Sequence, residues 1–130
     1  MEKNTKLSLV IVSLIFSCIL ITFFIQKYRV NVDDPILILI LGSAPSFFYT
    51  LGVLLICVLV VQKEPEKNCF FVFIGSLIYE LSQVIGVDRR TFDYVDISFI
   101  VMAFILFTLL IKKSGYLLNL KESATKKAED

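Results

Sequence analysis

The residue that could most directly carry chemistry is Glu80, an ionisable side chain inside a long apolar stretch. A carboxyl group in such surroundings is costly unless it is paired, hydrated or neutralised. In a helix, Ser76, Glu80 and Gln83 fall at positions i, i+4 and i+7, so they share one face. We expect this face to turn toward other helices or a cavity, and not toward lipid.

A second polar group lies at the mouth of the next apolar stretch and comprises Arg90, Asp93 and Asp96. Asp93 suits the N-cap of a helix, and Asp96 would lie in the first turn, where a carboxylate complements the helix dipole. An arginine of this loop could fold inward and pair with one of the carboxyl groups.

A third polar segment, Gly42-Ser43-Ala44-Pro45-Ser46, interrupts another apolar stretch, with Tyr49 about one turn further on. Proline removes a backbone donor from a helix, and such sites are tolerated in membranes where polar groups or water satisfy the backbone. The sequence therefore predicts a helix that is broken near Pro45, at a depth similar to that of Glu80. Residues 36–44 could instead form a half-helix.

These segments together predict one outward-facing polar pocket. The alternative is a buried ion-pair network that only fixes the register of the helices. We expect no catalytic residue, no metal and no cofactor, because no nucleophile–base pair or metal-ligand spacing stands out, although enzymatic activity stays open. The residues expected to bind a ligand are Ser46, Tyr49, Glu80, Gln83, Arg90, Asp93 and Asp96.

The elements that must position these residues follow from the apolar pattern. The chain of 130 residues is 57% hydrophobic and 19% charged, with a mean hydropathy of +0.82 and no histidine. Within its four apolar stretches the only charged residues are Glu80 and Asp96; the stretches are 7–25, 36–61, 69–87 and 95–111. Each is near the length of about 20 residues that spans a bilayer.

This pattern excludes a soluble globular domain, a disordered chain and a secreted disulfide scaffold. The lack of histidine excludes histidine-based catalysis and the commonest zinc sites. The sequence thus predicts an all-α polytopic membrane protein. Its four transmembrane helices would occupy residues 1–113, and residues 114–130 would form a cytoplasmic tail.

The basic residues predict the orientation. Nine of the 13 Lys and Arg residues lie in the N-terminus, the loop 62–68 and the tail, which four spans would place on one side. Because basic residues favour the cytoplasmic side, we expect both termini there and the loops 26–35 and 88–94 outside. The first stretch is expected to be a retained helix, since no A-x-A cleavage site follows it.

The polar residues also carry a family resemblance. The run Glu80-Leu-Ser-Gln83, a short gap and Arg90-Thr-Phe-Asp93-Tyr-Val-Asp96 resemble the VanZ-like family of small bacterial membrane proteins. The resemblance covers about residues 75–111. Members commonly continue with an Asn and closely spaced glycines, where this chain has Ile100, Ala103 and Phe107, so it would be a divergent member.

The resemblance implies a protein of the bacterial inner membrane whose family namesake is associated with low-level teicoplanin resistance. The pocket residues add a possible ligand, because an outward cavity with carboxylates and arginines could hold the headgroup of a lipid or lipid-linked envelope precursor; no nucleic-acid partner is expected. A small secondary transporter or transporter subunit, with Glu80 as its substrate or proton site, is the alternative. An accessory subunit and an enzyme acting on a lipid-linked substrate are further readings, and a homo-oligomer stays open.

Overall fold

The computed structural model describes residues 2–61, 64–85 and 93–115, together with residues 122, 125, 126 and 128. All the secondary structure of this described part is helical, with no strand, which confirms the all-α prediction there. Most of the predicted tail 114–130 lies outside the described residues. The elements are α1 (Glu2–Tyr28), the short 3-10 helix η1 (Arg29–Asn31), α2 (Pro35–Val60), α3 (Pro65–Ile85) and α4 (Tyr94–Ser114).

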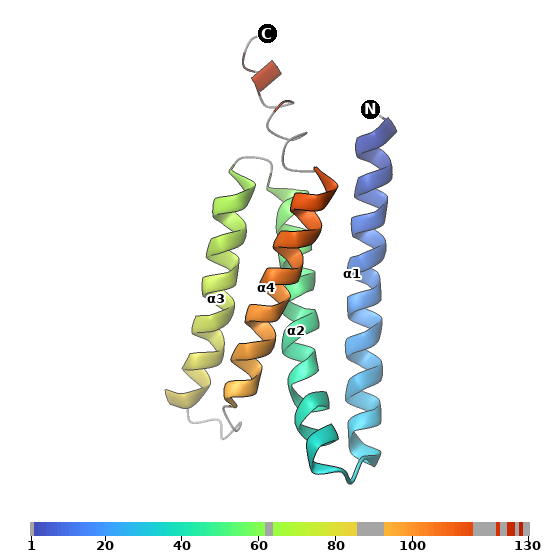
Figure 1. The fold of residues 1–130 in the computed structure, drawn as a ribbon, viewed down its shortest axis with the longest axis vertical. Coiled ribbons are helices and arrows are strands. Elements are labelled where there is room, and N and C mark those ends of the chain that lie inside the picture. Colours follow the sequence, from blue (N-terminus) through green and yellow to red (C-terminus); the bar gives the residue numbers. More distant parts are fainter. Residues whose placement is uncertain are drawn as a thin grey trace.

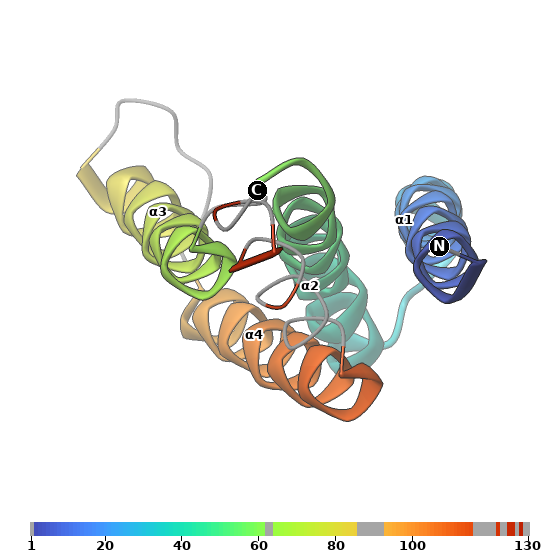
Figure 2. The same ribbon diagram turned by 90° about the horizontal axis from the view of Figure 1, so that it is seen from above.

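The four α-helices run up and down beside one another, so that α1 begins and α4 ends at the same end of the bundle (Figure 1). Helix α2 is central and packs against α1, α3 and α4. Seen from above, α1 lies beside α2 on the side away from α3, and α4 lies alongside both α2 and α3 (Figure 2). The core is therefore built around α2.

The helix ends are set by local chemistry. At the start of α2, Oδ1 of Asp34 accepts hydrogen bonds from the backbone N–H groups of Ile36 (2.9 Å) and Leu37 (3.3 Å). Pro35 follows at the first helical position, where a missing N–H costs nothing. Helix α4 ends at Gly115, whose φ of 65° is the left-handed conformation that glycine adopts without strain.

Helix α2 continues through Pro45, which lies inside a helix that extends without interruption from Pro35 to Val60. The predicted break near Pro45 is therefore not confirmed. Pro45 has no N–H to donate to the carbonyl of Leu41. This carbonyl therefore needs a hydrogen-bond donor other than the residue four positions further on.

The packing between α2 and α4 uses one stripe of each helix. On α4 the buried residues recur with helical spacing: Ile100, Ala103, Phe107 and Ile111. On α2 they include Leu51, Leu54, Leu55 and Val58, of which Leu54 has no exposed surface. Ala103 also has no exposed surface, and its small side chain lets the two helices approach closely.

The outer surface of the bundle is strongly apolar. On α1 the side chains of Phe16, Ile19 and Phe23 are all more than half exposed. A soluble monomer rarely exposes so continuous an apolar surface. Helices α1, α2 and α4 are each long and apolar enough to cross a bilayer, and the protein is membrane-embedded by this criterion.

Candidate functional site

A polar groove lies at the end of the bundle where α3 ends and where α2 and α4 begin. It encloses a volume of about 840 Å³ and is lined from α1, η1, α2, α3 and the start of α4. Six of the seven predicted binding residues line it, namely Ser46, Tyr49, Glu80, Gln83, Asp93 and Asp96. The seventh, Arg90, lies outside the described residues.

Glu80 lies deepest among these residues and is only 7% exposed. The hydroxyl group of Ser46, on α2, donates a hydrogen bond to its Oε1 at 3.3 Å. This bond joins α2 to α3 beside Pro45, which also lines the groove. The predicted proximity of the Pro45 segment and Glu80 is therefore present, although α2 remains helical.

The start of α4 supplies two more carboxyl groups. Asp93 is the N-cap of α4, as predicted, and its Oδ1 accepts a hydrogen bond from the backbone N–H of Val95 at 3.1 Å. Asp96 lies in the first turn, and its Oδ1 is buried with no hydrogen-bond partner among the described residues. The carboxyl groups of Asp96 and Glu80 are near enough to interact electrostatically.

The cation of the described groove is Arg29, in η1, which the sequence pattern did not single out. Its guanidinium lies over Gly42 of α2, because a Cβ atom built on that glycine would be 3.6 Å from the Nη2 atom of Arg29. Gln26 and Thr22 of α1 extend the same wall. The available signal was the position of Arg29 in the loop 26–35, on the side predicted for Arg90.

The remaining predicted residues differ in how they meet the groove. Gln83 is half-buried, whereas Tyr49 is 64% exposed and forms part of the rim. Ser76, expected to share the face of Glu80, donates to the backbone carbonyl of Val72 and is not among the residues that line the groove. The polar residues of α3 that line the groove therefore lie only in the last turns of the helix.

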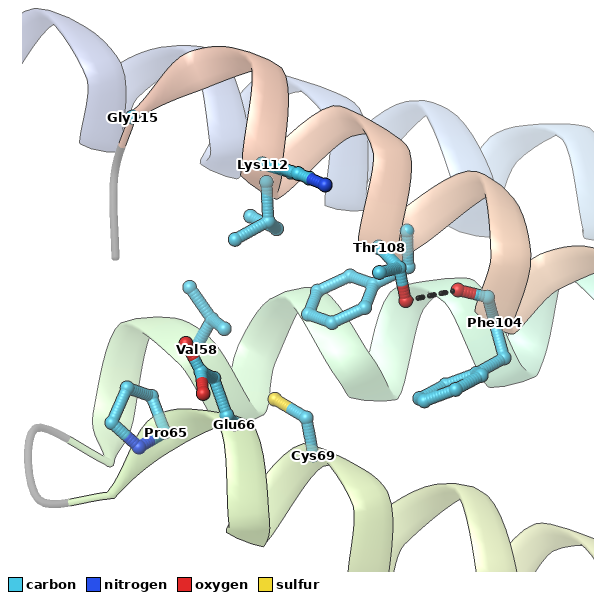
Figure 3. A pocket seen from close by; sticks show the side chains of 10 residues that line it. Val58, Pro65, Glu66, Cys69, Phe104, Thr108, Lys112 and Gly115 are labelled. Carbon is cyan, nitrogen blue, oxygen red and sulfur yellow. Dashed lines mark hydrogen bonds between the residues drawn. The ribbon is translucent and has the colours of Figure 1, made fainter. Parts of the chain in front are cut away.

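A second cavity, of about 490 Å³, lies at the opposite end of the bundle between α2, α3 and α4 (Figure 3). Cys69 and Glu66 reach it from α3, and Thr108 and Lys112 from α4 (Figure 3). The hydroxyl of Thr108 already donates to the carbonyl of Phe104 at 2.8 Å, and most of the wall is apolar. This cavity lacks the converging carboxyl groups of the groove.

The groove contains one contact of the kind made by a nucleophile and its base. The hydroxyl of Ser46 and Oε1 of Glu80 are 3.3 Å apart, against about 2.6–3.2 Å typical of such pairs. Within the described ranges no group of three His, Cys, Asp or Glu side chains is placed to hold a metal ion. The three cysteines are buried and free, as expected of small apolar residues.

The fold and the groove together define the class: an all-helical, membrane-embedded protein with a charged groove between the ends of its helices. No family model matches the chain, and no curated protein or solved structure matches it either. The chemistry of the groove therefore has to indicate the function.

Proposed function

We propose that this protein binds the polar headgroup of a membrane lipid or of a lipid-linked envelope precursor in its groove. The observation that carries the proposal is the convergence of Glu80, Asp96 and Arg29 on one cavity at the end of an apolar bundle. Charged side chains are expensive in a membrane-embedded helix, and they are retained there mainly for function. A lipid headgroup carries charged and hydrogen-bonding groups that can pair with these three side chains.

The proposal includes a placement in the membrane. Four spans, including α3, would place the groove in the outer half of the bilayer and both termini in the cytoplasm. The basic residues support this orientation, since nine of the 13 fall in the N-terminus, the loop 62–68 and the tail, which four spans would place on the opposite side from the groove. Helix α3 also lies alongside α2 and α4, both of which are apolar enough to span (Figure 1).

The similarity of residues 75–111 to the VanZ-like pattern supports a role in the bacterial inner membrane, of the glycopeptide-tolerance type. The test is teicoplanin and vancomycin susceptibility of a sensitive bacterial host that expresses the protein. Wild type should raise teicoplanin tolerance, and Glu80→Gln should abolish the increase at equal membrane levels. Glu66→Gln is the matched control, because Glu66 lies on the same helix but lines the other cavity.

No change in tolerance with wild type would remove the glycopeptide role. An equal loss with Glu80→Gln and Glu66→Gln would show that the effect does not depend on the groove.

A transporter or transporter subunit is the second candidate. The specific observation in its favour is Glu80 itself, a carboxyl group that is 7% exposed yet lines a cavity beside a proline-containing helix. Proteoliposomes that contain the protein should then show solute or proton flux that Glu80→Gln abolishes. Flux that persists in this variant would exclude Glu80 as the coupling site.

A further inference from the structure

The described groove holds more carboxyl groups than cationic groups. Glu80, Asp93 and Asp96 line it together with a single described arginine, Arg29. Asp93 already accepts the N–H of Val95 as the helix cap. Glu80 and Asp96 are the two carboxyl groups of the groove that do not cap a helix, although Oε1 of Glu80 accepts the hydroxyl of Ser46.

These two carboxyl groups are near one another without being joined. They interact electrostatically, but no hydrogen bond connects them among the described residues, and Oδ1 of Asp96 is buried without a donor. Two acidic groups that share a low-dielectric site repel one another when both are ionised. A cationic donor in the groove beside them would offset this repulsion. A primary ammonium has three N–H donors and can serve both groups.

Arg29 and Glu80 contact the same face of α2, at positions that are one helical turn apart. The guanidinium of Arg29 lies at Gly42, and Glu80 is bonded to Ser46, four residues further along the helix. Four residues of α-helix rise by about 6 Å. The cationic and the acidic parts of the groove are therefore separated by a distance that one small headgroup can bridge.

We propose that the groove binds a zwitterionic ligand whose primary ammonium is held between Glu80 and Asp96 and whose phosphate is held by Arg29. Arginine suits this role because its planar guanidinium donates paired hydrogen bonds to phosphate. The inference rests on the proposed function, since it concerns the same groove, and it narrows the ligand to phosphoethanolamine chemistry. A lipid headgroup and a free phosphoamine both carry this chemistry.

The test is equilibrium binding to the purified full chain in detergent micelles, with five probes. Three are lipids with identical acyl chains: phosphatidylethanolamine, phosphatidylcholine and phosphatidylglycerol. The other two are free phosphoethanolamine and inorganic phosphate. We expect phosphatidylethanolamine to bind at least tenfold more tightly than the other two lipids, because only its nitrogen has three donors.

Variants then assign the two halves of the ligand. Asp96→Asn and Glu80→Gln should each reduce the preference for phosphatidylethanolamine to less than threefold. Arg29→Ala should weaken phosphatidylethanolamine and phosphatidylglycerol alike. The controls are Glu66→Gln and Lys27→Ala, which remove one acidic and one basic side chain outside the groove. The preference of the wild type is informative even where a variant does not fold.

The outcomes separate this inference from the proposed function. Equal binding of phosphatidylethanolamine and phosphatidylglycerol would overturn the ammonium site and leave headgroup binding intact, as would equal binding of phosphatidylcholine. Binding of free phosphoethanolamine over inorganic phosphate, without lipid binding, would support the ammonium site and overturn the lipid role. No binding of any probe would overturn both.

Discussion

The hydrogen bond from Ser46 to Glu80 is the contact by which α2 holds the buried carboxyl group in the groove. Removing the donor with Ser46→Ala leaves a buried carboxyl oxygen without it. We expect the free energy of unfolding to fall by about 1 kcal/mol, in keeping with hydrogen bonds between membrane helices. Unfolding by sodium dodecyl sulfate in mixed micelles measures this.

The control for this substitution is Ser98→Ala, because the exposed Ser98 hydroxyl donates only to the carbonyl of Tyr94 within its own helix. If both variants lost the same stability, the contact between α2 and α3 would contribute nothing of its own.

A substitution at Glu80 distinguishes a role in ligand binding from a purely structural role. An apolar side chain of similar length avoids the cost of burying a carboxyl group, so Glu80→Met should cost no more than about 1 kcal/mol, the amount lost with the hydrogen bond from Ser46. It should at the same time abolish headgroup binding. The same unfolding and binding assays test both expectations. A fall in stability of more than about 2 kcal/mol would identify Glu80 as a structural residue that fixes the helices.

At the scale of elements, the contact between α2 and α4 depends on a small residue. Ala103 has no exposed surface and lies in the buried stripe of α4. Ala103→Leu should therefore cost about 1–3 kcal/mol of stability through overpacking. Val101→Leu enlarges a side chain that is 37% exposed and should be nearly neutral in the same unfolding assay. Equal effects would show that α4 packs by another face.

The start of α2 is a second element whose stability has an identified source. Oδ1 of Asp34 accepts two backbone N–H groups there, so Asp34→Ala should destabilise the protein by about 1 kcal/mol. Asp34→Asn should restore most of this, because its amide oxygen caps a helix equally well. Asp33→Ala serves as the control. If Asp34→Asn did not restore the stability, the loss in Asp34→Ala would come from the missing charge and not from the missing cap.

The elements were largely predictable because a spanning helix leaves a simple signal. The apolar stretch 36–61 differs by one residue at each end from α2, and 95–111 lies within α4. Helix α1 begins earlier than its apolar stretch 7–25, because its first turns are polar and hydropathy does not report them. The break predicted at Pro45 is not confirmed, because a proline can change the hydrogen bonding of one turn without ending the helix.

The site was predictable only where periodicity applies. Gln83 and Glu80 share a helical face, and Asp93 and Asp96 follow the rules for a helix start, so their shared cavity could be anticipated. Arg29 could not, because its place over Gly42 depends on how α1 packs against α2. Similarly, the pattern of polar residues did not single out Ile100, Ala103 and Phe107, which lie in the buried stripe of α4.

At the scale of the whole molecule, the position of the groove depends on whether α3 crosses the membrane. Among the described residues, helices α1, α2 and α4 are long and apolar enough to span, whereas α3 carries Glu80, Gln83 and a polar first turn. It is nevertheless packed against α2 and α4. A polar helix can be held in a bilayer when its polar face is turned to neighbouring helices or a water-filled cavity.

The number of crossings can be determined from parity. Four crossings place both ends of the helical bundle on one side, whereas three crossings place them on opposite sides. We expect a reporter fused after Lys113 to be cytoplasmic, on the same side as an N-terminal reporter, and a reporter fused after Asn31 to be outside. The fusion after Asn31 is the internal control, because only α1 precedes it. A Lys113 reporter outside the cell, with the Asn31 result unchanged, would mean that α3 does not cross. The loop that precedes α4 would then lie in the cytoplasm, and the groove could not receive a ligand from the outer half of the bilayer.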